Sequence, residues 1–308
     1  MPITLVLKNI VPPAGSHPHD VAPTITNQDN NTIVWFTAQS TGQLGKLDKT
    51  TGQTHLIPLG QGSAPHGVII GPDGAPWITD GGLNAIVRVD PKSEEIKTFS
   101  LPGGSQNANL NTATFDKNGI LWFTGQSGIY GKLNTSIGQI KVFNAPKGPG
   151  PYGITTTPNG TVYFASLAGS YIAKIDPIKN DSAIVIEPPT SDQGARRVWS
   201  DSQGKIWVSE WNAGKLGMYN PANNKWKEWK LPGNNPMPYA VYADKKDVVW
   251  LTDFGSNAFI RFDPTKEIFT EIKIPSAGAN VRQILGVPDE VWGTESGTDK
   301  IISIKTGS

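Results

Sequence analysis

The chain has 308 residues, no cysteine and a formal net charge of +1, from 27 basic and 26 acidic residues. The lack of cysteine excludes disulfides and thiol chemistry, and balanced charge without a Lys/Arg run argues against nucleic acid as a partner. No apolar run approaches the roughly 18 residues that cross a bilayer, and no signal peptide is visible, so we expect a cytoplasmic protein that does not bind membranes.

The chain opens with a predicted strand over residues 3–11, ITLVLKNIV, which two prolines follow. Residues 12–31 then read as the most loop-like segment, and they contain His17, His19 and Asp20. From residue 32 onward the sequence repeats a single pattern.

The repeating unit is clearest at residues 64–80, APHGVIIGPDGAPWITD. A short entry loop leads into an apolar strand, a Gly-Pro-Asp-Gly turn follows, and a second strand opens on an aromatic residue. Pro presets the first corner of such a turn, and Gly accepts the positive φ at the last. The aromatic recurs at intervals of 41 to 45 residues, as Trp35, Trp77, Trp122, Tyr163, Trp207, Trp250 and Trp292.

Each unit also predicts a third and a fourth strand. The third strand ends in a motif such as GKLD, often followed by an Asp-Pro dipeptide, which favours a turn. The fourth alternates apolar and polar residues. The third strands end within 45–48, 87–91, 131–134, 173–177, 216–221 and 260–264; the fourth cover 54–58, 96–102, 139–146, 225–232 and 268–275.

Seven units of four strands with a period in this range predict a seven-bladed β-propeller, an all-β fold, over residues 1–308 as one domain. The last unit stops after its third strand, at 301–305. We therefore expect the N-terminal strand to complete the last blade and remove a free sheet edge. We expect a monomer.

Loops that enter the first strand of each unit gather at one rim of a propeller, so one repeat position becomes a ring of side chains. The position eleven residues before the aromatic holds large polar residues. Allowing a longer turn in the first unit and a shorter one in the last, the ring comprises His19, His66, Asn111, Tyr152, Arg196, Tyr239 and Arg282. Arg197 competes for the fifth place. We expect His19 and His66 to be catalytic and the other members to bind substrate.

A second ring lies three residues after the aromatic and comprises Ala38, Asp80, Gly125, Ser166, Glu210, Asp253 and Glu295. We expect Asp80 to act with His66 as a catalytic residue, and Asp80 and Glu295 to hold a metal. Glu210, the neighbouring Trp211, Asp253 and Glu295 complete the predicted substrate-binding set. The structural alternative is that these carboxylates cap loops.

A resemblance to a known family is carried by the motifs PHGVIIGPDGAPWITD, PYGITTTPNGTVYFAS and NGILWFTG…YGKL. The chain resembles the virginiamycin B lyase (streptogramin B lyase) family over essentially its whole length. The resemblance implies a seven-bladed propeller that opens a cyclic depsipeptide by elimination: a His takes the α-proton beside an ester, the C–O bond breaks and Mg²⁺ assists. Where the family places catalytic histidines, in the last two blades, this sequence has Tyr239 and Arg282, and Glu295 roughly matches the acid. His19 and His66, in two adjacent blades, suggest that the site is displaced around the ring.

Three functions are compatible with these residues. The first is a lyase acting on a small or cyclic molecule by His-mediated proton abstraction, with Mg²⁺ as a possible cofactor. The second is a propeller that binds a peptide, glycan or protein on its rim without chemistry. The third is a metal-dependent lactone or sugar hydrolase, which would need several inward carboxylates. The fold does not choose among them, because function depends on the site.

Overall fold

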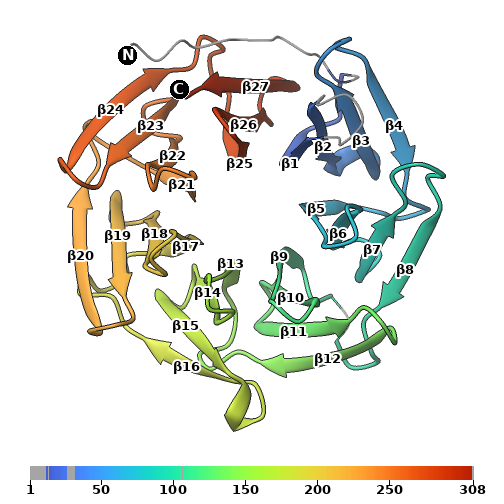
Figure 1. The fold of residues 1–308 in the computed structure, drawn as a ribbon, viewed down its shortest axis with the longest axis horizontal. Helices are drawn as coiled ribbons and strands as arrows, with labels where there is room; N and C mark the ends of the chain where they lie inside the picture. The colour runs from blue at the N-terminus through green and yellow to red at the C-terminus, as the bar shows by residue number, and fades with distance from the viewer. Residues whose placement is uncertain (1–11, 13, 26–31, 106, 307–308) are drawn as a thin grey trace. The chain divides into compact units, whose positions relative to one another are not determined.

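The computed structural model describes residues 12, 14–25, 32–105 and 107–306. In these residues the chain forms strands β1 to β27 and two short 3-10 helices, η1 (Gln39–Thr41) and η2 (Pro177–Lys179). The strands make seven antiparallel sheets whose members follow sequence order, as Figure 1 shows. Six sheets have four strands, and the last has three within the described residues. The fold is a seven-bladed β-propeller, which confirms the predicted fold class.

The strand bounds follow the predicted repeat. The first two blades contain β1 (Pro18–Ile25), β2 (Thr32–Ala38), β3 (Gln43–Asp48) and β4 (Thr54–Pro58), then β5 (Pro65–Ile70), β6 (Pro76–Asp80), β7 (Ala85–Val89) and β8 (Ile96–Ser100). The third and fourth contain β9 (Leu110–Phe115), β10 (Ile120–Gly125), β11 (Ile129–Asn134) and β12 (Gln139–Asn144), then β13 (Pro151–Thr156), β14 (Val162–Ser166), β15 (Tyr171–Asp176) and β16 (Ser182–Ile186).

The remaining blades repeat the arrangement. The fifth and sixth contain β17 (Ala195–Ser200), β18 (Ile206–Glu210), β19 (Lys215–Asn220) and β20 (Lys225–Lys230), then β21 (Pro238–Ala243), β22 (Val249–Asp253), β23 (Ala258–Asp263) and β24 (Ile268–Lys273). The seventh contains β25 (Val281–Val287), β26 (Glu290–Glu295) and β27 (Lys300–Lys305). The predicted closing strand at 3–11 lies outside the described residues.

The chain packs into two compact units, which we describe separately. The first unit comprises residues 1–100 and 274–308, and the second comprises residues 101–273. In the first unit, β1 packs beside both β5 and β25. In the second unit, β13 packs beside β9 and β17, and β17 packs beside β21. The single-domain assignment stays a prediction.

Buried indoles of the repeat bind a carboxylate in the preceding turn, four residues earlier in the second blade and six residues earlier in the third, fifth and sixth. The indole nitrogen of Trp77 donates to the turn carboxylate of Asp73 at 3.1 Å, and Trp122 does the same with Asp116 at 3.0 Å. The pairs Trp207 with Asp201 and Trp250 with Asp244 repeat this bond at 2.9 Å. Each bond satisfies the one polar atom of a buried indole, so the large ring can fill the core without an unpaired donor.

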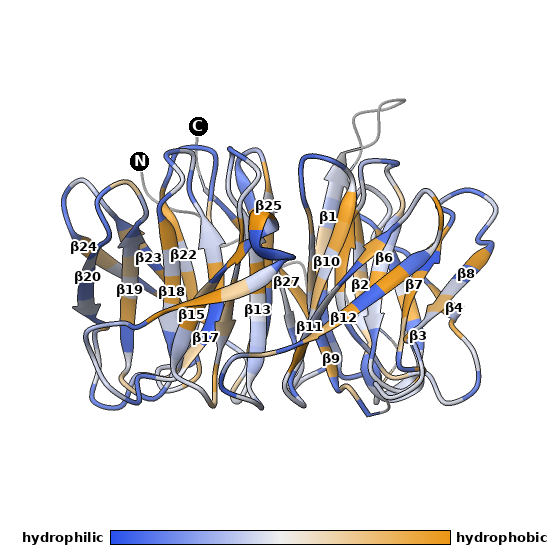
Figure 2. Cartoon of the chain, turned by 90° about the horizontal axis from the view of Figure 1, so that it is seen from below, coloured by the Kyte–Doolittle hydropathy of each residue, from blue (hydrophilic) through white to orange (hydrophobic). Residues whose placement is uncertain are grey.

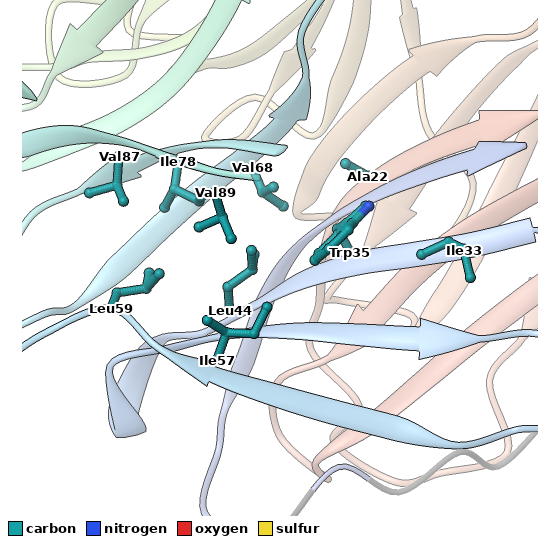
Figure 3. Packing of buried hydrophobic residues seen from close by; sticks show 10 residues of the cluster. All are labelled: Ala22, Ile33, Trp35, Leu44, Ile57, Leu59, Val68, Ile78, Val87 and Val89. Carbon is teal, nitrogen blue, oxygen red and sulfur yellow. The ribbon is translucent and has the colours of Figure 1, made fainter. Parts of the chain in front are cut away.

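Blades pack face to face through aliphatic side chains and these aromatics. Figure 3 shows the cluster between the first two blades, where Trp35, Leu44 and Ile57 face Val68, Ile78, Val87 and Val89. Fully burying one such side chain contributes roughly 1.5–3 kcal/mol. In Figure 2 the apolar colours follow the strands, whereas the connecting loops are largely hydrophilic.

The segment 12–31, expected to be the most loop-like, contains β1. Pro18 and Pro23 lie within β1, which is the first strand of its sheet and pairs on one side only, with β2. Proline is tolerated on such an edge strand because one set of N–H groups needs no ladder partner. Among the described residues no helix has the length and apolarity needed to cross a membrane.

Candidate functional site

A β-bulge interrupts the first strand of every blade at the same place. One extra residue lies in the first strand relative to its partner, as between Pro18 and Val21 in β1 and between Pro65 and Gly67 in β5. The same shift occurs in the other five blades. Bulges re-aim side chains, and these bulges coincide with the ring of large polar residues expected from the sequence. The register places Arg196 first in its bulge and Arg197 second.

Hydroxyl groups on the second strands hold these bulges in place. The Thr37 hydroxyl accepts from the Asp20 N–H at 3.0 Å and donates to the His66 carbonyl at 2.8 Å. Thr294 donates to the His19 carbonyl at 2.8 Å. Ser209 does the same in the second unit, accepting from Arg197 N–H and donating to the Tyr239 carbonyl. The Thr or Ser two residues after the aromatic thus joins one bulge to the next.

In the first unit, the bulges bring together the residues that we call the histidine cluster: His19, Asp20, His66 and Arg282. The His19 Nδ1 lies 2.8 Å from an Asp20 carboxylate oxygen. The His19 and His66 ring centres are 3.9 Å apart. His19, Asp20 and His66 are only 2%, 1% and 6% exposed, so the cluster is almost completely shielded from solvent.

Arg282 completes the histidine cluster from β25. Its Nε donates to the Ser296 hydroxyl at 2.9 Å, and its Nη1 lies 3.3 Å from His19 Nε2. With the Nδ1 proton directed at Asp20, the His19 Nε2 carries the lone pair that faces the guanidinium. The cluster therefore contains an oriented imidazole, a second imidazole and a fixed positive charge.

The structure engages Asp80 elsewhere. One carboxylate oxygen accepts from the N–H groups of Ala64, Gly82 and Leu83 at 2.9–3.0 Å, and the other accepts from the Ser63 hydroxyl at 2.5 Å. This pattern matches the loop-capping alternative, because an Asp that binds N–H groups two and three residues ahead closes an Asx-type turn. The catalytic assignment of Asp80 stays a prediction, and Asp20 holds the position beside the imidazole.

The other predicted carboxylates differ from one another. Asp253 caps its loop as Asp80 does, accepting from the N–H groups of Met237, Gly255 and Ser256. Glu295 accepts from the Thr298 hydroxyl at 2.5 Å. Glu210 is fully buried, and neither carboxylate oxygen has a hydrogen-bond partner. Burial, with a smaller contribution from Glu228, raises the pKa of Glu210 to about 8, so this carboxyl is mostly protonated at neutral pH.

In the second unit, the bulges assemble what we call the arginine–tyrosine cluster: Tyr152, Arg196, Arg197, Trp211 and Tyr239. The Tyr152 and Tyr239 hydroxyls lie 2.5 Å apart, and Arg196 Nη2 donates to the Tyr152 hydroxyl at 3.0 Å. Burial raises the pKa of Tyr152 to about 12, so this phenol stays neutral. The Arg197 guanidinium reaches the Thr112 hydroxyl, which donates to the Asn111 side chain at 2.7 Å.

One group of three or more possible metal ligands occurs in the described residues: His19, Asp20 and His66, whose ligand atoms lie within 4.8 Å of one another. Two imidazoles and one carboxylate suit first-row transition metals, whereas Mg²⁺ prefers a set of oxygen ligands. The oxygens of Asp80, a predicted metal ligand, already bind backbone and hydroxyl donors. The residues in place therefore do not fit Mg²⁺ well.

Comparison with known proteins places the chain in a family of propellers. A family model described as the virginiamycin B lyase family matches residues 14–224 and 146–308. The chain belongs to this family. Virginiamycin B lyase from Staphylococcus aureus has a similar structure, with a TM-score of 0.89 and 22% identity over 99% of this chain and 100% of that one. A structure described as streptogramin B lyase matches with a TM-score of 0.86 at 22% identity, over 98% of this chain and 97% of that one.

Two further matches carry chemical information about the relatives themselves. A catalytically inactive variant of virginiamycin B lyase from Staphylococcus aureus, solved with quinupristin, matches with a TM-score of 0.84 and 21% identity over 99% of each chain. A gluconolactonase from Zymomonas mobilis subsp. mobilis is 34% identical over 100 residues, which span 31% of this chain and 27% of that protein. At these identities the solved lyases establish the fold of this member of the virginiamycin B lyase family.

Sequence reasoning found the first residue of each bulge and gave less weight to the second. Asp20 has no role in the predicted site, and Arg197 enters it only as an alternative to Arg196, although each directly follows a ring member. In a regular strand successive side chains point to opposite faces, so only the bulge brings the residue after a ring member into the same cluster. A Thr or Ser two residues after the aromatic is also visible in six of the seven units, the exception being Ala165, and the prediction makes no use of it.

Proposed function

We propose that this member of the virginiamycin B lyase family is a carbon–oxygen lyase acting on a small or cyclic molecule. The reaction takes a proton from a carbon beside a carbonyl and expels a neighbouring oxygen. The observation that supports this proposal most directly is the buried His19–Asp20 pair, with a 2.8 Å contact at Nδ1. A carboxylate bound to one imidazole nitrogen fixes the tautomer that has its lone pair on the other nitrogen.

In the proposed reaction, His19 Nε2 is the base. It accepts the α-proton, the C–H electron pair forms a carbon–carbon double bond, and the adjacent C–O bond breaks to release a carboxylate. Asp20 stabilises the imidazolium that results. These steps need a neutral imidazole, whose ordinary pKa near 6.5 suits proton transfer at neutral pH.

Arg282 and His66 have supporting roles in this proposal. In this proposal the Arg282 guanidinium, 3.3 Å from His19 Nε2, stabilises the negative charge that develops on the substrate carbonyl and the leaving carboxylate. A preorganised donor of this kind is typically worth about 3–4 kcal/mol of barrier. His66, whose ring centre is 3.9 Å from that of His19, can pass the abstracted proton onward and restore the base.

The test is incubation with a cyclic depsipeptide of the streptogramin B class, followed by mass spectrometry. Elimination opens the ring without changing its mass, whereas hydrolysis adds one water. We expect ring opening at unchanged mass, and its loss in His19→Ala. His55→Ala is the matched control, because His55 lies on an exposed outer strand, where its ring contacts Glu94 at 3.0 Å. Normal turnover by a folded His19→Ala variant would remove His19 from the mechanism.

A second candidate is a metal-dependent lactone hydrolase. Two observations favour it: the grouping of His19, Asp20 and His66, and the partial similarity to a gluconolactonase. This function predicts stoichiometric binding of Zn²⁺ or Mn²⁺, lost in His66→Ala, and lactone opening with gain of one water. Absence of turnover on both substrate classes, with no metal bound, would favour a propeller that binds its ligand without chemistry.

A further inference from the structure

Arg196, in the arginine–tyrosine cluster, carries a positive charge with which no carboxylate of the described residues pairs. The centre of its guanidinium lies 3.8 Å from the Tyr239 ring centre, 4.4 Å from that of Trp211 and 4.7 Å from that of Tyr152. Three aromatic faces therefore surround one cation. Such contacts stabilise the charge but leave the in-plane N–H groups available for an anion.

The hydrogen bonds of Arg196 are incomplete. Nη2 donates to the Tyr152 hydroxyl, and the buried Nε has no partner. Among the described residues, Nη1 has no acceptor, and the residue as a whole is partly exposed. A guanidinium with unused donors in a partly buried site favours an anionic ligand, because charge-assisted bonds to a carboxylate are shorter and stronger than neutral ones.

The neighbouring groups do not supply that negative charge. Burial raises the pKa of Tyr152 to about 12, so its phenol is not an anion at neutral pH. Glu210, which pairs with Ala195 beside Arg196 in the sheet, has a pKa raised to about 8 by burial and is mostly neutral. A second guanidinium, that of Arg197, lies 5.1 Å from the Tyr152 ring centre and adds positive charge to the same place.

The surroundings of Arg196 also specify the rest of the ligand. Trp211 and Phe254 are partly exposed, and their ring centres lie 5.4 Å apart in an edge-to-face arrangement. Phe254 stacks on Tyr239 at 5.0 Å. This aromatic wall beside the guanidinium offers apolar contact to a flat group. We propose that the arginine–tyrosine cluster binds a small organic carboxylate that carries an aromatic or flat apolar group. The proposal is independent of the reaction at the histidine cluster.

Calorimetric titration with sodium benzoate tests this site, with benzamide as a neutral probe of nearly the same shape and with acetate and inorganic phosphate at equal ionic strength. We expect saturable benzoate binding, weaker acetate and phosphate binding, and none of benzamide. Arg196→Gln should weaken benzoate binding at least about tenfold. Arg88→Gln is the matched control, because Arg88 pairs with Asp73 at 2.7 Å in the first unit.

Trp211→Leu keeps the charge and removes part of the aromatic wall, so it should weaken benzoate more than acetate. This variant and the benzoate–benzamide comparison test the site even if Arg196→Gln does not fold. The proposal is overturned if benzoate does not bind saturably, if benzamide or phosphate binds as tightly, or if a folded Arg196→Gln variant binds benzoate normally. Loss of lyase activity would not bear on it, because the assay measures binding alone.

Discussion

The histidine cluster and the arginine–tyrosine cluster both form at β-bulges, but their side chains have different chemistry. In both, a bulge in the first strand of a blade directs two consecutive residues into one cluster: His19 with Asp20, and Arg196 with Arg197. In the first case a carboxylate orients a base. In the second, aromatic rings surround a cation. The bulge determines which side chains come together, and the types of those residues determine the chemistry of the site.

The largest expected effect distinguishes Asp20 from Asp80, the two aspartates of the first unit that could act with a histidine. Asp20→Asn removes the carboxylate that orients His19, so turnover in the ring-opening assay should fall roughly 10²- to 10⁴-fold. Asp20→Glu should recover part of the loss if orientation is its role. Asp80→Asn should lower thermal stability and leave turnover nearly unchanged, because Asp80 binds loop N–H groups. The reverse pattern would restore Asp80 to the catalytic set.

Glu210 lies buried in the second unit, and its raised pKa predicts that the stability of the protein depends on pH. Its native pKa of about 8 lies above the ordinary value of 4.5, so the native state binds more protons than the unfolded state between these values. Stability should therefore fall as pH rises from about 4.5 to 8. A tenfold difference in proton affinity between the two states corresponds to about 1.4 kcal/mol, so the loss amounts to a few kcal/mol. Melting temperatures across this range measure it.

Glu210→Gln keeps the size of the side chain and removes its titration, so the melting temperature of this variant should vary less between pH 5 and 8. The control is Asp253→Asn, which alters the residue at the same repeat position in the next blade, where the carboxylate binds loop N–H groups. If the wild-type and Glu210→Gln profiles run parallel, the carboxyl does not titrate as its burial suggests.

Removing the threonine hydroxyl that joins two neighbouring bulges should lower the stability of each unit by a similar amount, but should lower turnover only in the first unit. Thr37→Val leaves the Asp20 N–H and the His66 carbonyl without their buried partner, at a cost of roughly 2–4 kcal/mol. Thr124→Val removes the corresponding bridge to the Tyr152 carbonyl, at a similar cost. Chemical denaturation measures both. Turnover should fall only with Thr37→Val, and an equal fall in both variants would contradict the assignment of the reaction to the histidine cluster.

The smallest expected effect concerns close packing at the arginine–tyrosine cluster. A Cβ at Gly153 would lie 2.7 Å from the Arg197 Cα, so Gly153→Ala must push β13 and β17 apart. Overpacking of this kind costs roughly 1–3 kcal/mol. Gly103→Ala is the matched control, since nothing lies near its Cβ position and its φ is outside the left-handed region. Benzoate affinity should fall with Gly153→Ala; unchanged stability and affinity would show that the strands adjust freely.

Most of the fold could be predicted from the sequence because the same strand pattern repeats seven times along the chain. The Trp-to-Asp turn bond and the Asp-Pro corners are local, so spacing alone predicted the strands and their order. The β1 strand was the exception, since Pro18 and Pro23 resemble loop residues unless an edge strand accepts them.

The near-constant spacing along the chain is enough to predict the seven-bladed repeat and the ring of polar residues that includes His19, His66 and Arg196. Tertiary structure alone decided which carboxylate meets the imidazole. The sequence favours Asp80, which ends the strand after His66, but in the structure a bulge turns Asp20 toward His19, whereas loop N–H groups occupy Asp80. Side chains along a regular strand alternate between the two faces of the sheet, and the extra residue of a bulge interrupts this alternation. Where a bulge forms depends on how the strands pair and not on composition.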